Sequence, residues 1–382
     1  MNRRNFIKVL GAGAVVVAAG PVVVGQLSST TGSLLRPTQT YSDLRKTLIS
    51  YALLCPNPHN TQPWKVALEG EDTILLYVDS ERLLPQTDPI HRQIHIGHGT
   101  FIESLVVAAS HFATRANVTY FPDGEYNNQV LENKPVARIR LVADSNVKPD
   151  PLFNLLVTRQ SNKTVYDEQK LSETELEQIL DSVKGTEFQL KLIQSAEQNE
   201  TMRNFLNNAM VIEEQNSERS LETINMFRFN DEELKRYRDG FGLPQNGVTG
   251  AKRWLAEQFF VSRKSALKDP AAFGKEGVKL TKTVTKNTQY FALLVSKDNR
   301  RLTQLEVGRL YNRINLLTES LGIAQHPMSQ ILQEYQDMLP LQRDFKSYFN
   351  IPEAHTVQML FRLGKAKRTP ESPRREVTDV LI

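Results

Sequence analysis

The chain has 382 residues, of which 40% are hydrophobic, 24% charged and 8% aromatic, a composition that excludes a disordered or fibrous protein. Its length allows two domains or one large duplicated domain. The formal net charge is +4, but Arg3, Arg4 and Lys8 supply three of these charges, which leaves +1 (4 − 3) for the rest. This balance argues against a nucleic-acid partner.

The first segment, residues 1–35, is predicted to be a signal and a linker. Arg3 and Arg4 precede an uncharged run from Val9 to Gly25, and the pattern resembles a twin-arginine export signal. The resemblance implies passage through the twin-arginine export machinery, with any cofactor already bound, to a periplasmic or other extracytoplasmic location. A membrane anchor is the alternative, since the apolar run approaches the roughly 18 to 20 residues that a span needs.

A helix is predicted from Tyr41 to Leu54, and a proline-containing loop follows, Cys55-Pro-Asn-Pro-His-Asn-Thr-Gln-Pro-Trp64. Prolines cannot continue a helix and restrict the residues before them, so the loop should be stiff. The amide groups of Asn60 and Gln62 can then bind the edge of a planar polar ring, with Trp64 closing the loop. The alternative is a polar helix-to-strand turn with a buried tryptophan. Cys55, the only cysteine, is taken as a packing residue.

The segment His-Asn-Thr-Gln-Pro-Trp closely resembles the flavin-contacting loop of the nitroreductase superfamily and, within it, of the Acg-type FMN-binding oxidoreductases. The resemblance implies an α+β, nitroreductase-like fold that is internally duplicated, with mixed sheets flanked by helices. It also implies FMN as the cofactor, with Asn60 and Gln62 at the ring edge and Trp64 supporting the loop.

The next residues are predicted to form a hairpin, with strands at 65–68 and 73–78 around Gly70. An apolar helix is expected from Phe101 to about Ala113, followed by a strand at 136–142 and a boundary rich in Asp, Asn and Pro at 144–151.

Three histidines before that helix, His91, His95 and His98, have a spacing that would place them on one helix face as possible metal ligands. Gly97 and Gly99 disfavour a helix there. Solvated or packed histidines are therefore the default, and no metal ligand is predicted. An exported metal-binding protein remains a third functional reading.

A second cluster, Arg159, Ser161 and Lys163, places two cations around a hydroxyl and can surround a phosphate. It resembles the phosphate- and pyrimidine-binding segment of the nitroreductase superfamily, whereas a solvated charged loop is the alternative. Ser172 and Glu175 then predict a capping box at the start of a helix that runs through Leu180.

The middle of the chain is predicted to contain a strand at 188–193 and a polar helix at about 201–216. Residues 221–277 combine glycines with aromatic residues, which favours a lid-like insertion over a cofactor site; a peripheral helical pack is the alternative. A strand is expected again at 290–295.

An apolar helix is predicted from Val307 to Leu321, ending at Gly322. His326 and Met328 follow, in a segment that lies near the flavin ring in the superfamily. A strand is expected at 357–363, and the Ser-Pro-Arg-Arg ending resembles the close of the family, which makes Arg374 and Arg375 the candidates for gripping the FMN phosphate.

The two halves, residues 36–150 and 151–382, retain complementary motifs. The first half keeps the loop with Asn60 and Gln62, and the second half keeps the basic residues around Arg159 and Arg374. In a nitroreductase homodimer each flavin takes the loop from one subunit and the phosphate grip from the other. The distribution therefore predicts a pseudo-dimeric monomer with one FMN between the halves.

The functional hypothesis is an exported FMN-dependent oxidoreductase that transfers hydride or electrons through FMN N5. A small-molecule electron donor would reduce it, and a small acceptor of the quinone or nitroaromatic type would reoxidise it. No side chain is predicted to be catalytic, because in such enzymes the protein mainly positions and tunes the flavin. The alternative is a flavin-binding or flavin-sequestering protein without turnover.

Overall fold

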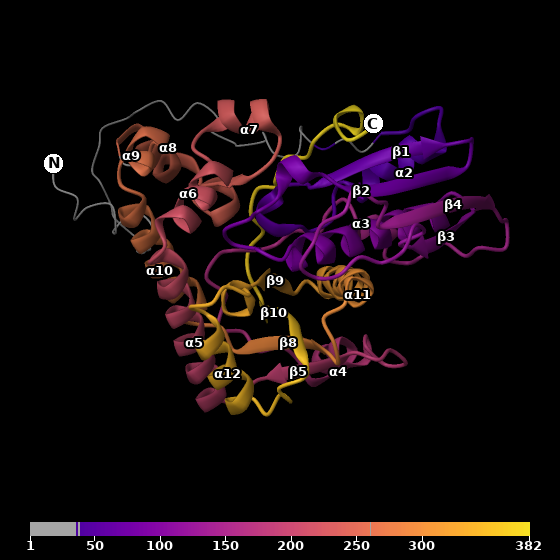
Figure 1. Ribbon diagram of the computed structural model, residues 1–382. Coiled ribbons are helices and arrows are strands. Elements are labelled where there is room, and N and C mark those ends of the chain that lie inside the picture. Colours follow the sequence, from indigo (N-terminus) through magenta and orange to yellow (C-terminus); the bar gives the residue numbers. More distant parts are fainter. Residues whose placement is uncertain (1–35, 37–38, 260) are drawn as a thin grey trace.

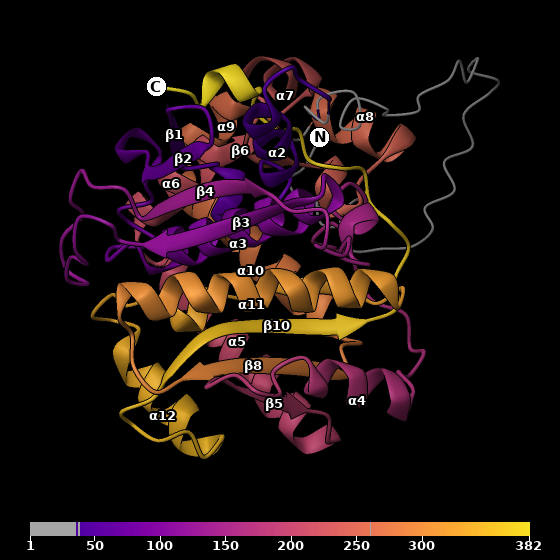
Figure 2. The same cartoon turned by 90° about the vertical axis from the view of Figure 1, so that its right-hand side faces the viewer.

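A computed structural model describes residues 36, 39–259 and 261–382, so the predicted export signal lies outside the described residues. Two four-stranded sheets lie on opposite sides of two long helices, α3 (Arg92–His111) and α11 (Arg301–Ser320) (Figures 1 and 2). No helix among the described residues is both long enough and apolar enough to cross a membrane.

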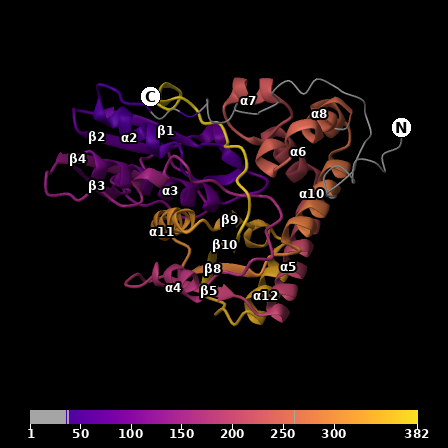
Figure 3. The same ribbon diagram turned by 180° about the vertical axis from the view of Figure 1, so that it is seen from behind.

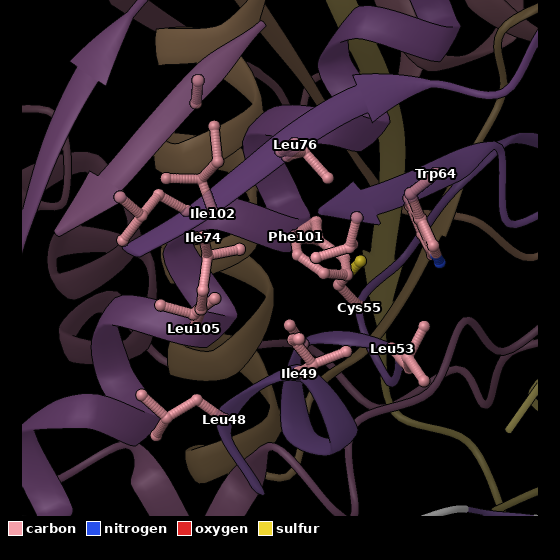
Figure 4. Close-up of a cluster of buried hydrophobic side chains, with 14 of the residues drawn as sticks. Leu48, Ile49, Leu53, Cys55, Trp64, Ile74, Leu76, Phe101, Ile102 and Leu105 are labelled. Atoms are coloured by element: carbon pink, nitrogen blue, oxygen red, sulfur yellow. The ribbon is translucent and has the colours of Figure 1, made fainter. Parts of the chain in front are cut away.

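The first sheet has the strand order β1-β2-β4-β3, with antiparallel pairs throughout. Its strands are β1 (Trp64–Glu69), β2 (Thr73–Val78), β3 (Thr114–Tyr120) and β4 (Ala137–Ala143). One face packs on α2 (Leu44–Ala52) and α3, and the close-up in Figure 4 shows Trp64, Cys55 and Phe101 within this core. The predicted hairpin is confirmed.

The second sheet has the order β5-β8-β10-β9, again with antiparallel pairs. Its strands are β5 (Gln189–Ile193), β8 (Tyr290–Ser296), β9 (Ala324–Pro327) and β10 (Thr356–Gly364). It is covered by α4 (Glu173–Asp181), α5 (Ala196–Glu214), α11 and α12 (Leu339–Tyr348).

Strand β8 is buried along its whole length because both faces of the second sheet are covered. Ala292 and Leu294 pack with α4 and α11, whereas Phe291 and Leu293 pack with α5 and α12. Successive side chains of a strand point to opposite faces, so a strand between two helical layers is apolar at every position.

The two central helices touch through a reciprocal glycine contact. A Cβ atom on Gly99 would lie 2.0 Å from the carbonyl oxygen of Leu305, and one on Gly308 would lie 2.0 Å from that of Ile96. In each helix, the glycine faces a carbonyl of the other helix, and that carbonyl belongs to the residue three positions before the other helix's glycine. Such a self-complementary contact is what an internal two-fold axis generates.

Both central helices begin earlier than the sequence predicts, at Arg92 rather than Phe101 and at Arg301 rather than Val307. The expectation that Gly97 and Gly99 disfavour a helix is wrong, because Gly99 is needed for the close contact with α11. Asp88 also supports the early start, since its carboxylate accepts the backbone N–H groups of Gln93 (3.1 Å) and Ile94 (2.9 Å).

His95 and His98 consequently lie on α3, where both are fully buried. The Nε2 atom of His95 is 2.7 Å from the Tyr126 hydroxyl, and Nδ1 of His98 is 2.8 Å from the carbonyl oxygen of Ile94. Within the part of the chain that the structure describes, no group of three or more His, Cys, Asp or Glu side chains is placed to hold a metal ion.

The insertion between α5 and β8 folds as short helices around a small apolar core beside the two halves (Figure 3). Its helices are α6 (Ser217–Met226), α7 (Asp231–Tyr237), α8 (Gly250–Phe259), α9 (Arg263–Lys268) and α10 (Pro270–Thr285). Two short strands, β6 (Phe227–Arg228) and β7 (Phe241–Gly242), pair in parallel.

After β10 the chain crosses from the second half to the first as an arm, residues 365–382. The backbone N–H of Val66 in β1 donates to Val380 (2.8 Å), and that of Ile382 donates to Val66 (3.0 Å). The resulting bridge between Val66 and Leu381 is parallel, so the first sheet is mixed at this edge. The predicted α+β fold, with sheets flanked by helices, is confirmed.

Candidate functional site

A cavity of about 780 Å³ lies where the two halves, the insertion and the arm meet. Its volume is in the range of about 300–1,000 Å³ that is usual for ligand and cofactor sites. Of the predicted site residues, those that line it are Asn60, Arg159, Ser161, Lys163, His326, Met328 and Arg374. Gln62, Trp64 and Arg375 do not line it.

The loop between α2 and β1 has an unusual backbone. His59, Asn60 and Gln62 have φ values of 48°, 56° and 53°, in the left-handed region. Non-glycine residues occupy this region at a cost and are held there by their surroundings, often at functional sites. The loop is held by hydrogen bonds to two distant segments, at residues 238–240 and 373–375.

Asn60 and Gln62 have different roles in this loop. Asn60 Nδ2 donates to the carbonyls of Gly240 (2.9 Å) and Pro373 (3.1 Å), and its Oδ1 is buried without a hydrogen-bond partner among the described residues. Gln62 bridges two segments instead: its Nε2 donates to the Arg238 carbonyl (2.9 Å), and its Oε1 accepts the backbone N–H of Arg375 (2.8 Å).

Arg159 and Arg374 form a pair of buried guanidinium groups in the cavity wall. A nitrogen of each donates to the carbonyl oxygen of Leu54, at 2.9 and 3.3 Å. No carboxylate within the described ranges forms an ion pair with either, and the Nε atom of each has no hydrogen-bond partner there. Burial lowers the pKa of Arg159 to about 10 and holds that of Arg374 well below its usual value.

Arg36 is a further cation at this end of the cavity, and no motif predicted its role. It pairs with Glu371 of the arm at 3.1 Å, and its positive charge helps to lower the pKa of both Arg159 and Arg374, after burial. Three like charges therefore lie at this end of the cavity, and among the described residues only Arg36 has an ion-pair partner. The chemistry of this donor set fits a dianion such as a phosphate monoester.

The segment 159–163 is fixed by the second half of the chain. The backbone N–H of Asn162 donates to the Gln325 carbonyl (2.9 Å), and the side-chain oxygen of Gln160 accepts the backbone N–H of Thr369 (3.0 Å). Ser161 lines the cavity between these two anchored residues. Its position is therefore set by rigid neighbours on both sides.

Lys163 lies in a different part of the cavity wall, with its ammonium group 3.8 Å from the centre of the Phe241 ring. It has no ion-pair partner in the described part of the chain, and burial lowers its pKa to about 8. The imidazole of His59 packs edge-on against the same ring, 5.7 Å between centres. Burial, followed by the charge of Lys163, lowers the pKa of His59 to about 4.

His326 and Met328 line the cavity from β9 and the turn after it. The Nδ1 atom of His326 accepts a hydrogen bond from Arg362 Nε (3.1 Å), and burial, followed by the charges of Arg362 and Lys163, depresses the pKa of its imidazole. Both cavity histidines, His59 and His326, are therefore neutral near pH 7 and can exchange hydrogen bonds without adding charge.

Arg374 and Arg375 are separated by the direction of the chain. Arg374 faces the cavity, whereas Arg375 donates to the Gln62 carbonyl (3.1 Å) and lies 3.7 Å from the Asp79 carboxylate. Arg375 thus holds the arm against the loop. Trp64, at the end of the loop, is wholly buried in the core of the first half.

Other polar atoms of the cavity wall have no partner among the described residues. They are His59 Nδ1, Gln93 Nε2 and Gln333 Oε1. Buried polar groups are normally hydrogen-bonded, so unpaired donors and acceptors around one cavity indicate a polar ligand. The sequence missed these residues because only the fold brings them to one wall.

The insertion supplies an aromatic wall. Phe227, Phe229, Phe241 and Phe273 all line the cavity, and their rings are in contact, with Phe227 4.8 Å from Phe229 and 5.7 Å from Phe273 between centres. The cavity therefore combines a cationic part with an aromatic part, an arrangement suited to a ligand with an anionic group and a planar ring system.

No protein-family model matches the chain. Over 86 residues it is 34% identical to "Putative NAD(P)H nitroreductase acg" of Mycobacterium tuberculosis. The match covers 22% of this chain and 26% of the relative, so it spans about a quarter of the relative's length.

A comparison with solved structures finds nitroreductases. An FMN-bound nitroreductase from Bacteroides fragilis covers 57% of this chain and 89% of its own, with 13% identity and a TM-score of 0.32. A mutant of the FMN and NADPH-dependent nitroreductase NfnB from Sphigopyxis sp. covers 61% of this chain and 98% of its own, with 13% identity and a TM-score of 0.37.

Proposed function

We propose that the cavity binds FMN and that the protein is an FMN-dependent oxidoreductase of the nitroreductase type. It would pass reducing equivalents from a small-molecule donor to a small acceptor such as a quinone or a nitroaromatic compound. The observation that carries the proposal is the buried pair of Arg159 and Arg374, which share the Leu54 carbonyl without a carboxylate partner in the described chain. The name of the curated relative supports the same reaction class.

Arg159 and Arg374 would hold the FMN phosphate, with Arg36 adding charge and Ser161 offering a hydroxyl. A phosphate monoester carries about −1.5 to −2 charges at pH 7. It would therefore neutralise two guanidinium groups that the folded chain holds at an electrostatic cost. Both groups donate to the Leu54 backbone carbonyl, and Arg159 also donates to the side-chain oxygen of Asn315, so both are held in place before the ligand arrives.

The unpaired Oδ1 of Asn60 and the neutral imidazoles of His59 and His326 would orient the ring system by hydrogen bonding. Met328 and Phe241 add apolar contact surface in the same cavity. When bound, FMN supplies the exchange of hydride or electrons with donor and acceptor. The chain itself binds, orients and limits access of water.

The first experiment is an absorption spectrum of the purified protein, followed by release and identification of any yellow cofactor. FMN should be present, or should be taken up when added. Arg159→Gln should lower FMN affinity by about 10- to 100-fold, since a hydrogen bond to a charged group contributes about 1.5–3 kcal/mol. Arg300→Gln, an exposed arginine paired with Glu125, is the matched control. A wild-type protein that fails to take up FMN would contradict the proposal.

A flavin-sequestering protein without turnover is the second candidate, favoured by the insertion, whose helices cover one wall of the cavity. The two candidates differ in reactivity. Photoreduced flavin in the wild-type protein should be reoxidised by a quinone faster than by buffer alone if the protein is an oxidoreductase. Equal rates would indicate storage.

We also propose that residues 1–35 direct twin-arginine export to the periplasm, supported by Arg3, Arg4 and the uncharged run after them. Cell fractionation should recover the wild-type protein outside the cytoplasm. Replacing both arginines by lysine should retain it inside, because the machinery recognises the arginine pair. An unchanged distribution would contradict this assignment.

A further inference from the structure

Two adjacent carboxyl groups, Glu213 and Glu214, lie at the end of α5 and line the cavity beside the insertion. Glu213 is only 4% exposed. Neither group forms an ion pair with a cation of the described chain. A buried carboxylate without a counter-charge is costly, so such a group tends to keep its proton.

The contacts of Glu213 leave one of its oxygens available. The Tyr335 hydroxyl donates to Oε2 at 3.0 Å, whereas no described residue forms a hydrogen bond with Oε1. Tyr335 is held in turn by Arg219, whose guanidinium lies 3.5 Å from the ring centre and pairs with Asp337 at 2.8 Å. The hydrogen bond to Oε2 thus orients the carboxyl group, and Oε1 can carry a proton.

A second feature of the same cavity points to a ligand near this wall. Gln333 is 7% exposed, its Oε1 has no partner among the described residues, and it lines the cavity two residues before Tyr335. Phe227, Phe273 and Met328 also line it. Apolar side chains limit competing water, which makes a positioned proton donor matter more.

Burial raises the pKa of Glu213 to about 8. The negative charges of Glu214 and Glu222 add to this rise, whereas the Tyr335 hydrogen bond and the charge of Arg219 oppose it. On the facing helix α10, Glu276 also lines the cavity and is paired with Lys279 at 2.7 Å. Glu213 therefore carries its proton at pH 7, as a general acid must.

We propose that Glu213 is a catalytic residue that donates the proton needed when the acceptor is reduced, an inference that rests on the proposed function. A quinone carbonyl oxygen takes the proton from Glu213 Oε1 as its O–H bond forms. The two electrons come as hydride from the reduced flavin, and the product is the hydroquinone. The Glu213 carboxylate then regains a proton from water.

One test reads the proton directly in the full-length protein. Infrared spectra of the wild type should show the C=O stretch of a protonated carboxylic acid at neutral pH, and it should disappear as the pH rises through about 8. The band should be absent from Glu213→Gln and retained in Glu200→Gln, an exposed glutamate of the same helix. A wild-type spectrum without this band would overturn the inference.

The second test measures how fast a quinone reoxidises photoreduced, FMN-loaded protein. The wild-type rate should fall as the pH rises through about 8. Glu213→Gln should be slower by about 100-fold or more and independent of pH, the usual contribution of a general acid. Tyr335→Phe removes a hydrogen bond that stabilises the carboxylate, so it should move the fall to higher pH.

The outcomes separate the two proposals. FMN binding with an unchanged rate and pH profile in Glu213→Gln would overturn the proton-donor role and leave the proposed function intact. Failure of the wild-type protein to bind FMN would overturn the proposed function and the role of Glu213 with it. Loss of FMN from Glu213→Gln alone would also overturn the inference, because a proton donor to the acceptor is not needed for binding the cofactor.

Discussion

At the scale of residues, folding brings the positive charges of the proposed anion site close together, so that they repel each other. Arg159 and Arg374 are buried, lie close to each other and donate to the same carbonyl, and burial lowers the pKa of each. A ligand that binds only the folded state stabilises it by mass action. Relief of this repulsion should therefore appear as ligand-dependent stability.

We expect FMN to stabilise the folded wild-type protein and so to raise its Tm. The free energy of unfolding should increase by about 2.7 kcal/mol when the free FMN concentration is 100 times Kd, and should continue to grow with the logarithm of that concentration. Arg374→Gln should lose most of this increase in Tm, because it removes one of the two guanidinium groups that are proposed to bind the phosphate. Differential scanning fluorimetry with and without FMN measures it, with Arg300→Gln as the control. Equal Tm increases in Arg374→Gln and the wild type would contradict the assignment.

Glu213 predicts a pH dependence of stability that is separate from catalysis. Its pKa is raised from 4.5 to about 8 in the folded state, so between these values the folded chain binds more protons than the unfolded chain. Its contribution is fully present below pH 4.5 and is lost as the pH rises to about 8. Urea unfolding across this window should show wild-type stability falling more steeply than that of Glu213→Gln; parallel curves would contradict the raised pKa.

Sequence motifs predicted the chemistry of the site better than its individual contacts. Asn60 and Arg374 line the cavity, whereas Gln62 and Arg375, one or two positions away, hold the loop and the arm together. Side chains of neighbouring residues leave the backbone in different directions, and a motif does not say which direction is inward. Glu213 could not be predicted, because its proton depends on burial by elements distant in sequence.

At the scale of elements, the crossing of α3 and α11 depends on two glycines, since any Cβ there would meet a backbone carbonyl at 2.0 Å. Gly99→Ala should destabilise the protein by at least about 1–3 kcal/mol through overpacking, although alanine favours an isolated helix. Gly308→Ala should have a similar effect. Ser320→Ala, at the exposed end of α11, should stay within about 0.5 kcal/mol. Urea unfolding is the measurement, and an unaffected Gly99→Ala would contradict the close contact.

The segment that holds Asn60 depends on a buried ion pair. Asp239 pairs with Arg228, buried beside it, and with Arg82 at 2.8 Å, and the next residue, Gly240, accepts a hydrogen bond from Asn60. Asp239→Asn should cost about 3–5 kcal/mol, because it leaves a buried charge unpaired, and should also weaken FMN binding.

Chemical denaturation and FMN titration measure the two effects of Asp239→Asn. Asp181→Asn, which removes an exposed pair with Lys184, is the control and should change neither. A variant that loses stability but keeps full FMN affinity would show that the segment at 238–240 does not position the loop.

Most strands were predictable from alternation and turn signals, and the hairpin at β1 and β2 and the capping box of α4 show this. The start of α3 was not, because local propensity counts glycine against a helix whereas packing between helices requires Gly99. The start of α11 was missed because the residues before Val307 are mostly polar. Strand β3 was not predicted, although Ala116, Val118 and Tyr120 alternate with polar residues. Such alternation is typical of a half-buried strand.

At the scale of the whole molecule, the cavity lies where the two halves meet. The strained loop with Asn60 belongs to the first half, and Arg159 and Arg374 belong to the second. The complementary loss of motifs allowed this division to be predicted. The insertion, in contrast, could be located in the sequence but its packing could not, since its small core depends on contacts among short helices.

We therefore expect one FMN per chain and a monomeric protein. Light scattering should give the mass of a single chain, and FMN titration should saturate at one equivalent. The reason is that the second half supplies no counterpart of the Asn60 loop for a second site. Saturation at two equivalents, or a site that forms only in a dimer, would contradict the single-site division.

The arm also imposes an order in time. Arg374 follows every other residue of the cavity wall in the sequence, and the ribosome makes the chain from its N-terminus. Both sheets can form while the anion site still lacks one of its guanidinium groups. If Arg374 holds the phosphate as proposed, the cofactor can be bound fully only after the arm has crossed back to β1, and therefore only after synthesis has passed residue 374.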